Sequence, residues 1–160
     1  MSITFNADEI LEMAEEIERN GAKFYRQAAK IATDETVQQR LASMAIMEDG
    51  HLETFQQIRE QLSEREKQPT AFDPDNQAAL YLRAMADARG CEGKISPTQE
   101  LTGQESVDEL IDIALNAEKE SVVFYTGLKE LVPVNAGRDL VGEIITEELS
   151  HITTLLWWKS

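Results

Sequence analysis

Two glutamate–histidine units constrain this chain more than any other feature of its sequence. Glu48 precedes His51 by three residues, and Glu148 precedes His151 by three residues. The chain has two histidines in all, so each histidine belongs to such a unit. Residues three apart share one face of an α-helix, and a carboxylate and an imidazole would therefore project together. Each unit predicts a helix that presents a pair of metal ligands.

Both units lie in apolar stripes of helical spacing. Alternating steps of three and four residues trace four such stripes, and each carries a charged residue near its middle. The stripes are Leu11, Ala14, Glu18, Gly21, Tyr25, Ala28, Ala32; Leu41, Met44, Glu48, His51, Phe55, Ile58, Leu62; Ile111, Ala114, Glu118, Ser121, Tyr125, Leu128, Val132; and Val141, Ile144, Glu148, His151, Leu155, Trp158.

Local signals place the ends of the four helices. Asn6 with Glu9, and Ser106 with Glu109, have the spacing of capping boxes, and Pro133 ends the third helix. The expected helices run over about 6–32, Asp34 to about Arg65, 106–131, and from about Ala136 to Trp158.

Between the second and third helices the character of the chain changes. Prolines and glycines accumulate over about 66–105, and the apolar periodicity weakens. A short helix is expected from about Asp75 to Arg89. Because a segment this long is unusual as a simple loop, it is expected to cross along the length of a bundle. The prediction is an all-α single domain over 1–160, with hairpin 1 at about 6–65, the crossover at about 66–105 and hairpin 2 at about 106–159.

The two hairpins repeat one another at an offset of 100 residues. Glu18 matches Glu118, Phe24-Tyr25 matches Phe124-Tyr125, and the two Glu-x-x-His units match as well. Such a repeat indicates one helical hairpin used twice.

The repeat places the charged residues at one height. Glu18 and Glu48 each lie 15 residues from a turn near Thr33, and the corresponding glutamates of the second hairpin lie 15 residues from Pro133. At ~1.5 Å per residue, each carboxylate is about 22 Å from its turn. If the hairpins pack stripe to stripe, four glutamates and two histidines meet in the core.

Such a cluster needs a compensating charge, because each buried unpaired carboxylate costs several kcal/mol. Two divalent cations would balance four carboxylates. One glutamate from each of two helices and a Glu-x-x-His unit from each of the other two form the ligand set of a dinuclear site in a four-helix bundle. Oxygen ligands with one imidazole per metal suit iron or manganese, and zinc could also bind. The predicted ligands are Glu18, Glu48, His51, Glu118, Glu148 and His151.

With these residues in register, the chain resembles the ferritin-like superfamily and more closely its rubrerythrin-like branch. The resemblance covers nearly the whole chain except the crossover, and it rests on Glu18, Phe24, Tyr25, Glu48, His51, Glu118, Phe124, Tyr125, Glu148 and His151. It implies a ferritin-like four-helix bundle with a non-haem di-iron centre, and a homodimer or higher homo-oligomer. It also implies that the diferrous form reacts with hydrogen peroxide or dioxygen, or that Fe²⁺ is oxidised for storage.

Two departures from the rubrerythrin pattern bear on function. The single cysteine, Cys91, excludes an internal disulfide and the paired cysteines of a rubredoxin-like domain, so electrons would come from an external donor protein. Ser121 stands where rubrerythrins tend to have an extra glutamate, which makes the ligand set the symmetric six of the bacterioferritin type. This weakens the expectation of rubrerythrin-type peroxide reduction without by itself favouring storage.

Other residues on or beside the stripes have a functional interpretation, a structural one, or both. Tyr25 and Tyr125 either donate hydrogen bonds to ligand carboxylates, or quench an oxidising equivalent there, or are core tyrosines. Gly21 and Ser121 either leave room for an oxidant or allow close helix packing, the latter slightly favoured. Trp158 is expected in the core, and Trp157 against a partner subunit. The glutamates one position off the stripes are expected to be solvated: Glu15, Glu16, Glu120 and Glu147.

The net charge and the hydropathy of the chain restrict its expected partners and cellular location. A net charge of −15 argues against nucleic acid and anionic membrane surfaces as partners. The first residues show no signal peptide, and no apolar run has the ~18 residues of a membrane span. The cytoplasm is the expected location.

Three functions stay open: an oxidoreductase acting on peroxide or dioxygen, a ferroxidase or iron-handling protein with Fe²⁺ as substrate, and a non-catalytic metal-binding bundle, with zinc as one candidate metal.

Overall fold

The computed structural model describes residues 6–64, 67, 80 and 100–159. The short helix expected at about 75–89, and most of the crossover, lie outside the described residues.

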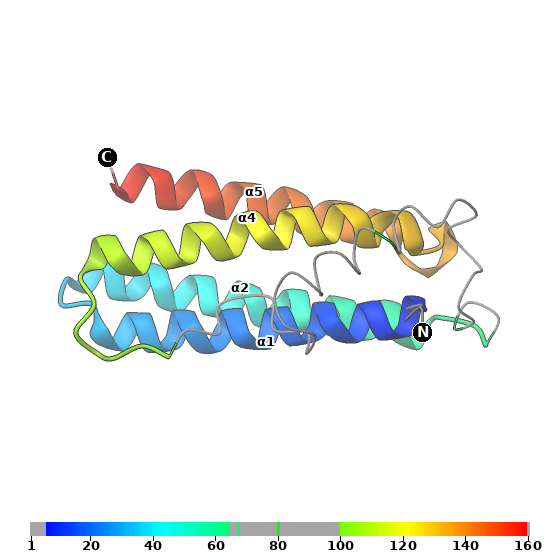
Figure 1. The fold of residues 1–160 in the computed structure, drawn as a ribbon, viewed down its shortest axis with the longest axis horizontal. Helices are drawn as coiled ribbons and strands as arrows, with labels where there is room; N and C mark the ends of the chain where they lie inside the picture. Colours follow the sequence, from blue (N-terminus) through cyan, green and yellow to red (C-terminus); the bar gives the residue numbers. More distant parts are fainter. Residues whose placement is uncertain (1–5, 65–66, 68–79, 81–99, 160) are drawn as a thin grey trace.

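Four long helices make up the described part of the chain. They pack as two antiparallel hairpins, α1 with α2 and α4 with α5, and all four lie along one long axis (Figure 1). The prediction of an all-α four-helix bundle is confirmed. The elements are α1 (Ala7–Ile31), α2 (Glu35–Glu60), α4 (Val107–Leu131), the 3₁₀ turn η1 (Val134–Ala136) and α5 (Arg138–Lys159).

Both predicted capping boxes are present. The Asn6 side chain accepts a hydrogen bond from the Glu9 amide at 2.9 Å, and the Glu9 carboxylate accepts one from the Asn6 amide at 3.0 Å. Ser106 and Glu109 make the same reciprocal pair at the start of α4. These bonds satisfy amides that have no partner within the helix, so they hold the starts of α1 and α4 at the predicted residues.

Two helix bounds differ from the prediction. Helix α2 ends at Glu60 rather than at about Arg65, because Gln61 and Leu62 close tighter turns onto Ile58 and Arg59. The Leu62 side chain then enters the core, with 5% of its surface exposed.

Helix α5 begins at Arg138 rather than at about Ala136. Residues 134–136 form the 3₁₀ turn, and Gly137 follows with a φ of 116°. This left-handed conformation interrupts the helical path and is one that glycine adopts readily. The second interhelical turn is therefore longer than the first.

The apolar core has two parts with the charged stripe residues between them. One cluster fills the end of the bundle where α1 begins, and it includes Leu11, Phe55 and Leu128. The other fills the end where α2 begins, and it includes Ala28, Leu41 and Ile111. Among the described residues, no helix is long and apolar enough to cross a membrane.

Candidate metal centre

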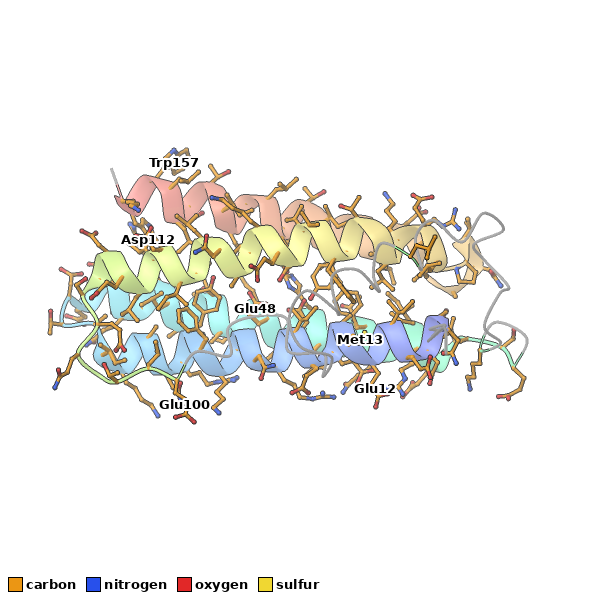
Figure 2. The ribbon with its side chains drawn as sticks, in the orientation of Figure 1. Glu12, Met13, Glu48, Glu100, Asp112 and Trp157 are labelled. Atoms are coloured by element: carbon orange, nitrogen blue, oxygen red, sulfur yellow. The ribbon has the colours of Figure 1, made fainter. Side chains whose placement is uncertain are left out.

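The structure brings all six predicted ligands together in the bundle core. Helices α1 and α4 each contribute one glutamate, and α2 and α5 each contribute a Glu-x-x-His unit. None of the six is more than 5% exposed. Figure 2 shows Glu48 near the middle of the long axis, between the helices.

The cluster consists of two overlapping groups, each with the composition of a metal site. One group is Glu18, Glu48, His51 and Glu148, and the other is Glu48, Glu118, Glu148 and His151. In each group, one ligand atom from every residue lies within 4.8 Å of the others. Glu48 and Glu148 belong to both groups, so each of them could contribute to both of two bound cations.

His51 turns its Nδ1 atom towards the carboxylates of the first group. Nδ1 lies 2.9 Å from Glu148 Oε1, 3.4 Å from Glu18 Oε2 and 3.9 Å from Glu48 Oε2. One nitrogen and three carboxylates therefore face a common point.

His151 has the same arrangement in the second group. Its Nδ1 lies 3.2 Å from Glu148 Oε2, 3.4 Å from Glu118 Oε1 and 3.5 Å from Glu48 Oε1. The two imidazole rings stack, with their centroids 5.8 Å apart and their planes at 26°. The two groups are thus related as the sequence repeat predicts.

Many polar atoms of the cluster are buried without a hydrogen-bond partner. Buried polar atoms are nearly always paired in proteins, so such a concentration needs an explanation. Two metal ions coordinated by these oxygens and Nδ1 atoms would account for every one of them except His151 Nε2, and the residues present therefore fit such ions. The atoms concerned are Glu18 Oε2, Glu48 Oε1, His51 Nδ1, Glu148 Oε1 and Oε2, and His151 Nδ1 and Nε2.

Burial and mutual repulsion raise the pKa values of some carboxyl groups in the cluster, whereas contacts with neighbouring side chains lower the pKa of another. Burial raises the pKa of Glu48 well above its usual range, and the charges of Glu18 and Glu148 raise it further. Burial, followed by the charge of Glu148, likewise raises the pKa of Glu118. Burial would also raise the pKa of Glu148, but its contacts with Glu118 and both histidines outweigh that effect and lower it. Without metal, the cluster therefore keeps protons on some of its carboxyl groups.

The histidines respond to the same carboxylates. Burial by itself would lower the pKa of His51, but contacts with Glu148 and Glu18 outweigh it and raise the pKa to about 11. Burial also opposes the shift at His151, where Glu118 and Glu148 raise the pKa to about 9. Both imidazoles are consequently protonated at neutral pH when no metal is bound, and they balance part of the carboxylate charge.

Each tyrosine of the repeat donates to a glutamate of the opposite hairpin. The Tyr25 hydroxyl donates to Glu118 Oε1, and the Tyr125 hydroxyl donates to Glu18 Oε1. Burial, followed by the charge of these same carboxylates, raises both tyrosine pKa values well above their usual range, so the phenols stay protonated donors. Of the readings left open for the tyrosines, the structure therefore shows a hydrogen bond to a predicted ligand carboxylate.

Gly21 makes room for a carboxylate of the cluster. A Cβ atom at this position would lie 3.2 Å from Glu48 Oε2, closer than most such contacts. The absence of a side chain at Gly21 thus makes space for the Glu48 carboxylate. Of the two interpretations of Gly21, the sequence favoured close helix packing, and the structure adds this contact with a predicted ligand. Ser121, at the matching position of α4, is buried with 7% of its surface exposed.

Comparison with known proteins identifies the family. A sequence model described as Rubrerythrin matches residues 9–156. The chain belongs to the rubrerythrin family. The predicted resemblance is therefore confirmed, and the buried Glu/His cluster is the feature that this rubrerythrin-family chain shares with dinuclear carboxylate sites.

A solved structure supports the fold of this rubrerythrin-family chain. A crystal structure of a candidate ferritin-like diiron-carboxylate protein from Thermotoga maritima superposes with a TM-score of 0.72 at 23% identity. The match covers 99% of this chain and 97% of that one, and it confirms the ferritin-like bundle. No curated protein sequence gives a significant match.

One of the glutamates expected to be solvated is buried instead. Glu15 is only 5% exposed, and it pairs with Arg19 at 3.0 Å and with Arg59 at 3.3 Å. It lies one position off the stripe, where α1 meets α2, and the arginines balance its charge. Glu16 is exposed as expected, and its ion pair with Arg19 is at the surface.

Glu147 is exposed as expected, but it also contacts a histidine of the cluster. Its side chain is half exposed, but its Oε2 atom lies 2.8 Å from His51 Nε2 across the α2–α5 interface. Glu120 is partly buried rather than fully solvated. The repeat offered no signal for the Glu147 contact, because the matching position in the first hairpin is Met47.

Proposed function

We propose that this chain binds two iron ions in the Glu/His cluster and that its diferrous form reduces hydrogen peroxide or dioxygen. The observation that carries the proposal is the pair of overlapping ligand groups that share Glu48 and Glu148. Oxygen-rich ligand sets with a single imidazole per metal favour iron or manganese. The rubrerythrin family match supports iron.

The chain's own residues prepare the site for this chemistry. Glu48 and Glu148 would each contribute to both metal positions, and His51 and His151 would each supply one nitrogen. Tyr25 and Tyr125 fix the orientations of Glu118 and Glu18, and the apolar clusters at both ends keep bulk water from the core. When bound, a diferrous pair would supply two electrons, enough to reduce hydrogen peroxide with two protons to two water molecules, or dioxygen with two protons to hydrogen peroxide.

An external protein is the proposed source of electrons for turnover. The chain has one cysteine, which excludes the two cysteine pairs of a rubredoxin-like electron-transfer domain within its 160 residues. In this proposal each cycle draws its electrons from a separate reductant that approaches the bundle surface.

A ferroxidase is the alternative function, because Ser121 weakens the expectation of rubrerythrin-type peroxide reduction. Ser121 replaces the extra glutamate expected on the third helix of rubrerythrins and leaves the symmetric six-residue ligand set. In that case Fe²⁺ is the substrate rather than a resident cofactor. A third alternative is a non-catalytic bundle that holds zinc in the same cluster.

Anaerobic loading with Fe²⁺, followed by separate additions of peroxide and air, distinguishes these functions. We expect two irons per chain, fast oxidation by peroxide and slower oxidation by air. Oxidation of many Fe²⁺ per chain would favour the ferroxidase. If neither oxidant reacted with an iron-loaded protein, both redox functions would be wrong and the zinc alternative would gain support.

A further inference from the structure

The two halves of the cluster differ just outside the ligand set. The Nε2 atom of His51 lies 2.8 Å from Glu147 Oε2. The Nε2 atom of His151 is buried and has no hydrogen-bond partner. Because the ligand groups themselves match, this contact is the principal asymmetry around the two histidines.

One substitution within the repeat accounts for the difference. Residue 47, which corresponds to Glu147 at the offset of 100, is a methionine. Met47 and His151 line the same cavity of about 350 Å³ between α2 and α5. A thioether is a weak acceptor, so Met47 is a poor replacement for the carboxylate that faces His51.

The contact with Glu147 determines which nitrogen of His51 is free for a metal. A neutral imidazole carries one N–H and one lone pair. If Nε2–H donates to Glu147, the lone pair belongs to Nδ1, which faces Glu148, Glu18 and Glu48. A carboxylate in this place also raises the basicity of the ligating nitrogen and fixes the ring orientation.

His151 has no carboxylate partner of this kind at Nε2 among the described residues. When its Nδ1 binds a cation, the proton resides on Nε2, where the described residues provide no acceptor. This N–H therefore lacks the charge-assisted hydrogen bond that Nε2 of His51 makes with Glu147. The metal position beside His151 is therefore the weaker of the two.

We propose that the two metal positions are inequivalent and that Glu147 is the positioning residue that makes the difference. The position formed by Glu18, Glu48, His51 and Glu148 binds a divalent cation more tightly and fills first. The position formed with Glu118 and His151 fills second and releases its cation more readily. This inference rests on the proposed two-metal site and adds an order of binding to it.

Calorimetric titration of the metal-free protein with Zn²⁺ tests the inference without any catalytic readout. The unmodified chain should show two binding steps that differ about 10–100-fold in affinity, the range that loss of such a histidine partner typically causes. A crystal grown with one Zn²⁺ per chain should show the metal beside His51.

Two reciprocal substitutions make the test specific. Glu147→Met gives both halves the arrangement of the His151 side and should weaken the tighter step about 10–100-fold. Met47→Glu gives both halves a carboxylate and should strengthen the weaker step by a similar factor. Glu143→Met removes the same charge from an exposed position one turn away on α5 and controls for long-range electrostatics. Glu147→Gln retains an acceptor oxygen, so it should keep part of the affinity of the tighter step that Glu147→Met loses.

The outcomes separate this inference from the proposed function. Two Zn²⁺ ions bound with equal affinity, or a Glu147→Met variant that behaves like Glu143→Met, would overturn the inference and leave the two-metal site intact. Failure of the unmodified chain to bind two metals would instead overturn the proposed function. Circular dichroism of each metal-free variant checks that the bundle has folded.

Discussion

Burial alone does not distinguish a metal ligand from a structural carboxylate in this chain. Glu15 and Glu18 lie three residues apart on α1, and both are buried. Glu15 is paired with arginines, whereas Glu18 faces a tyrosine hydroxyl, a histidine and further carboxylates. Among the described residues Glu18 has no ion pair with an arginine or lysine, only the contact with His51, and this distinguishes it as a candidate ligand.

Removing a shared glutamate should be more damaging than removing one that serves a single position. Glu48→Ala is expected to abolish tight binding of both cations, because Glu48 belongs to both ligand groups. Glu18→Ala should chiefly weaken the position beside His51 and lower the stoichiometry towards one metal per chain. Metal analysis after gel filtration measures both.

Glu16→Ala is the control for these variants, because Glu16 is an exposed neighbour of Glu18 on α1. Two metals retained by Glu48→Ala would show that the assignment of Glu48 as a bridging ligand is wrong.

The tyrosine contacts should affect metal binding and stability together. Tyr125→Phe removes the donor to Glu18 and leaves a buried carboxylate oxygen without its hydroxyl partner. We expect metal affinity to fall about 10-fold, at the lower end of the range for partners of ligands. Chemical denaturation of the metal-free protein should also show a loss of about 1–3 kcal/mol. Wild-type affinity in both Tyr125→Phe and Tyr25→Phe would contradict a role for the phenols in orienting ligands.

At the scale of elements, the two hairpins reach the same ligand geometry through different turns. Glu18 and Glu118 each lie 13 residues before the end of their helix. Glu48 lies 13 residues after the start of α2, but Glu148 lies only 10 residues after the start of α5. The 3₁₀ turn and Gly137 occupy positions that would otherwise belong to the first turn of α5, and Glu148 still reaches the level of the cluster.

Gly137 should therefore be sensitive to substitution. Its φ is 116°, and a Cβ there would lie 2.9 Å from Ile58 Cγ1. Gly137→Ala is expected to destabilise the protein by about 1–3 kcal/mol through backbone strain and this close contact. The midpoint of urea unfolding measures the change.

Gly50→Ala is the control for Gly137→Ala, because Gly50 lies in α2 with open space around its Cβ position. It should be neutral or stabilising by up to about 1 kcal/mol. Equal stability of the two variants would mean that the second turn tolerates a side chain.

At the scale of the whole molecule, the buried cluster couples metal binding to protonation. The pKa of His51 is raised to about 11 and that of His151 to about 9, while Glu48 and Glu118 also have raised pKa values. The metal-free protein therefore holds protons at neutral pH on atoms that a metal must occupy. Metal binding should release them.

Metal affinity should consequently increase with pH from neutrality to about 9, because fewer protons compete for the ligands. Titrations at pH 7 in buffers of different ionisation enthalpy should show release of more than one proton per chain. The melting temperature should rise when metal is added, since metal binds only the folded cluster. Affinity that is independent of pH, with no proton release, would show that the metal-free cluster is already deprotonated.

The outer face of α5 is our proposed interface for a homodimer. Leu149, Leu156 and Trp157 are 49%, 48% and 73% exposed. Figure 2 shows Trp157 pointing away from the bundle. Apolar side chains exposed together commonly mark an interaction site.

Analytical ultracentrifugation should find a dimer for the unmodified chain and a monomer for Trp157→Asp. Val134→Asp is the control, because it adds the same charge at an exposed apolar position in the turn. A monomeric unmodified chain would rule out the homodimer.

The amino-acid sequence by itself predicted the four helices, their stripes and the six residues of the candidate site. It could do so because helical spacing and capping depend on residues close together in the chain, and the 100-residue repeat can be read directly from the sequence. Asn6 and Ser106 start their helices through residues three positions away, and the height of Glu18 or Glu48 follows from a constant rise per residue. The helix ends were predicted less well, because Gly137 and Leu62 respond to neighbours in space.

Only the tertiary structure decided how the residues are paired across helices. Tyr125 donates to Glu18 of the other hairpin, Arg59 balances Glu15, and Glu147 contacts His51 where the repeat offers only Met47. Each of these pairs joins residues far apart in the chain. Their contacts depend on which sides of the helices pack against each other and on the conformations of the side chains. Helical periodicity gives no information about either.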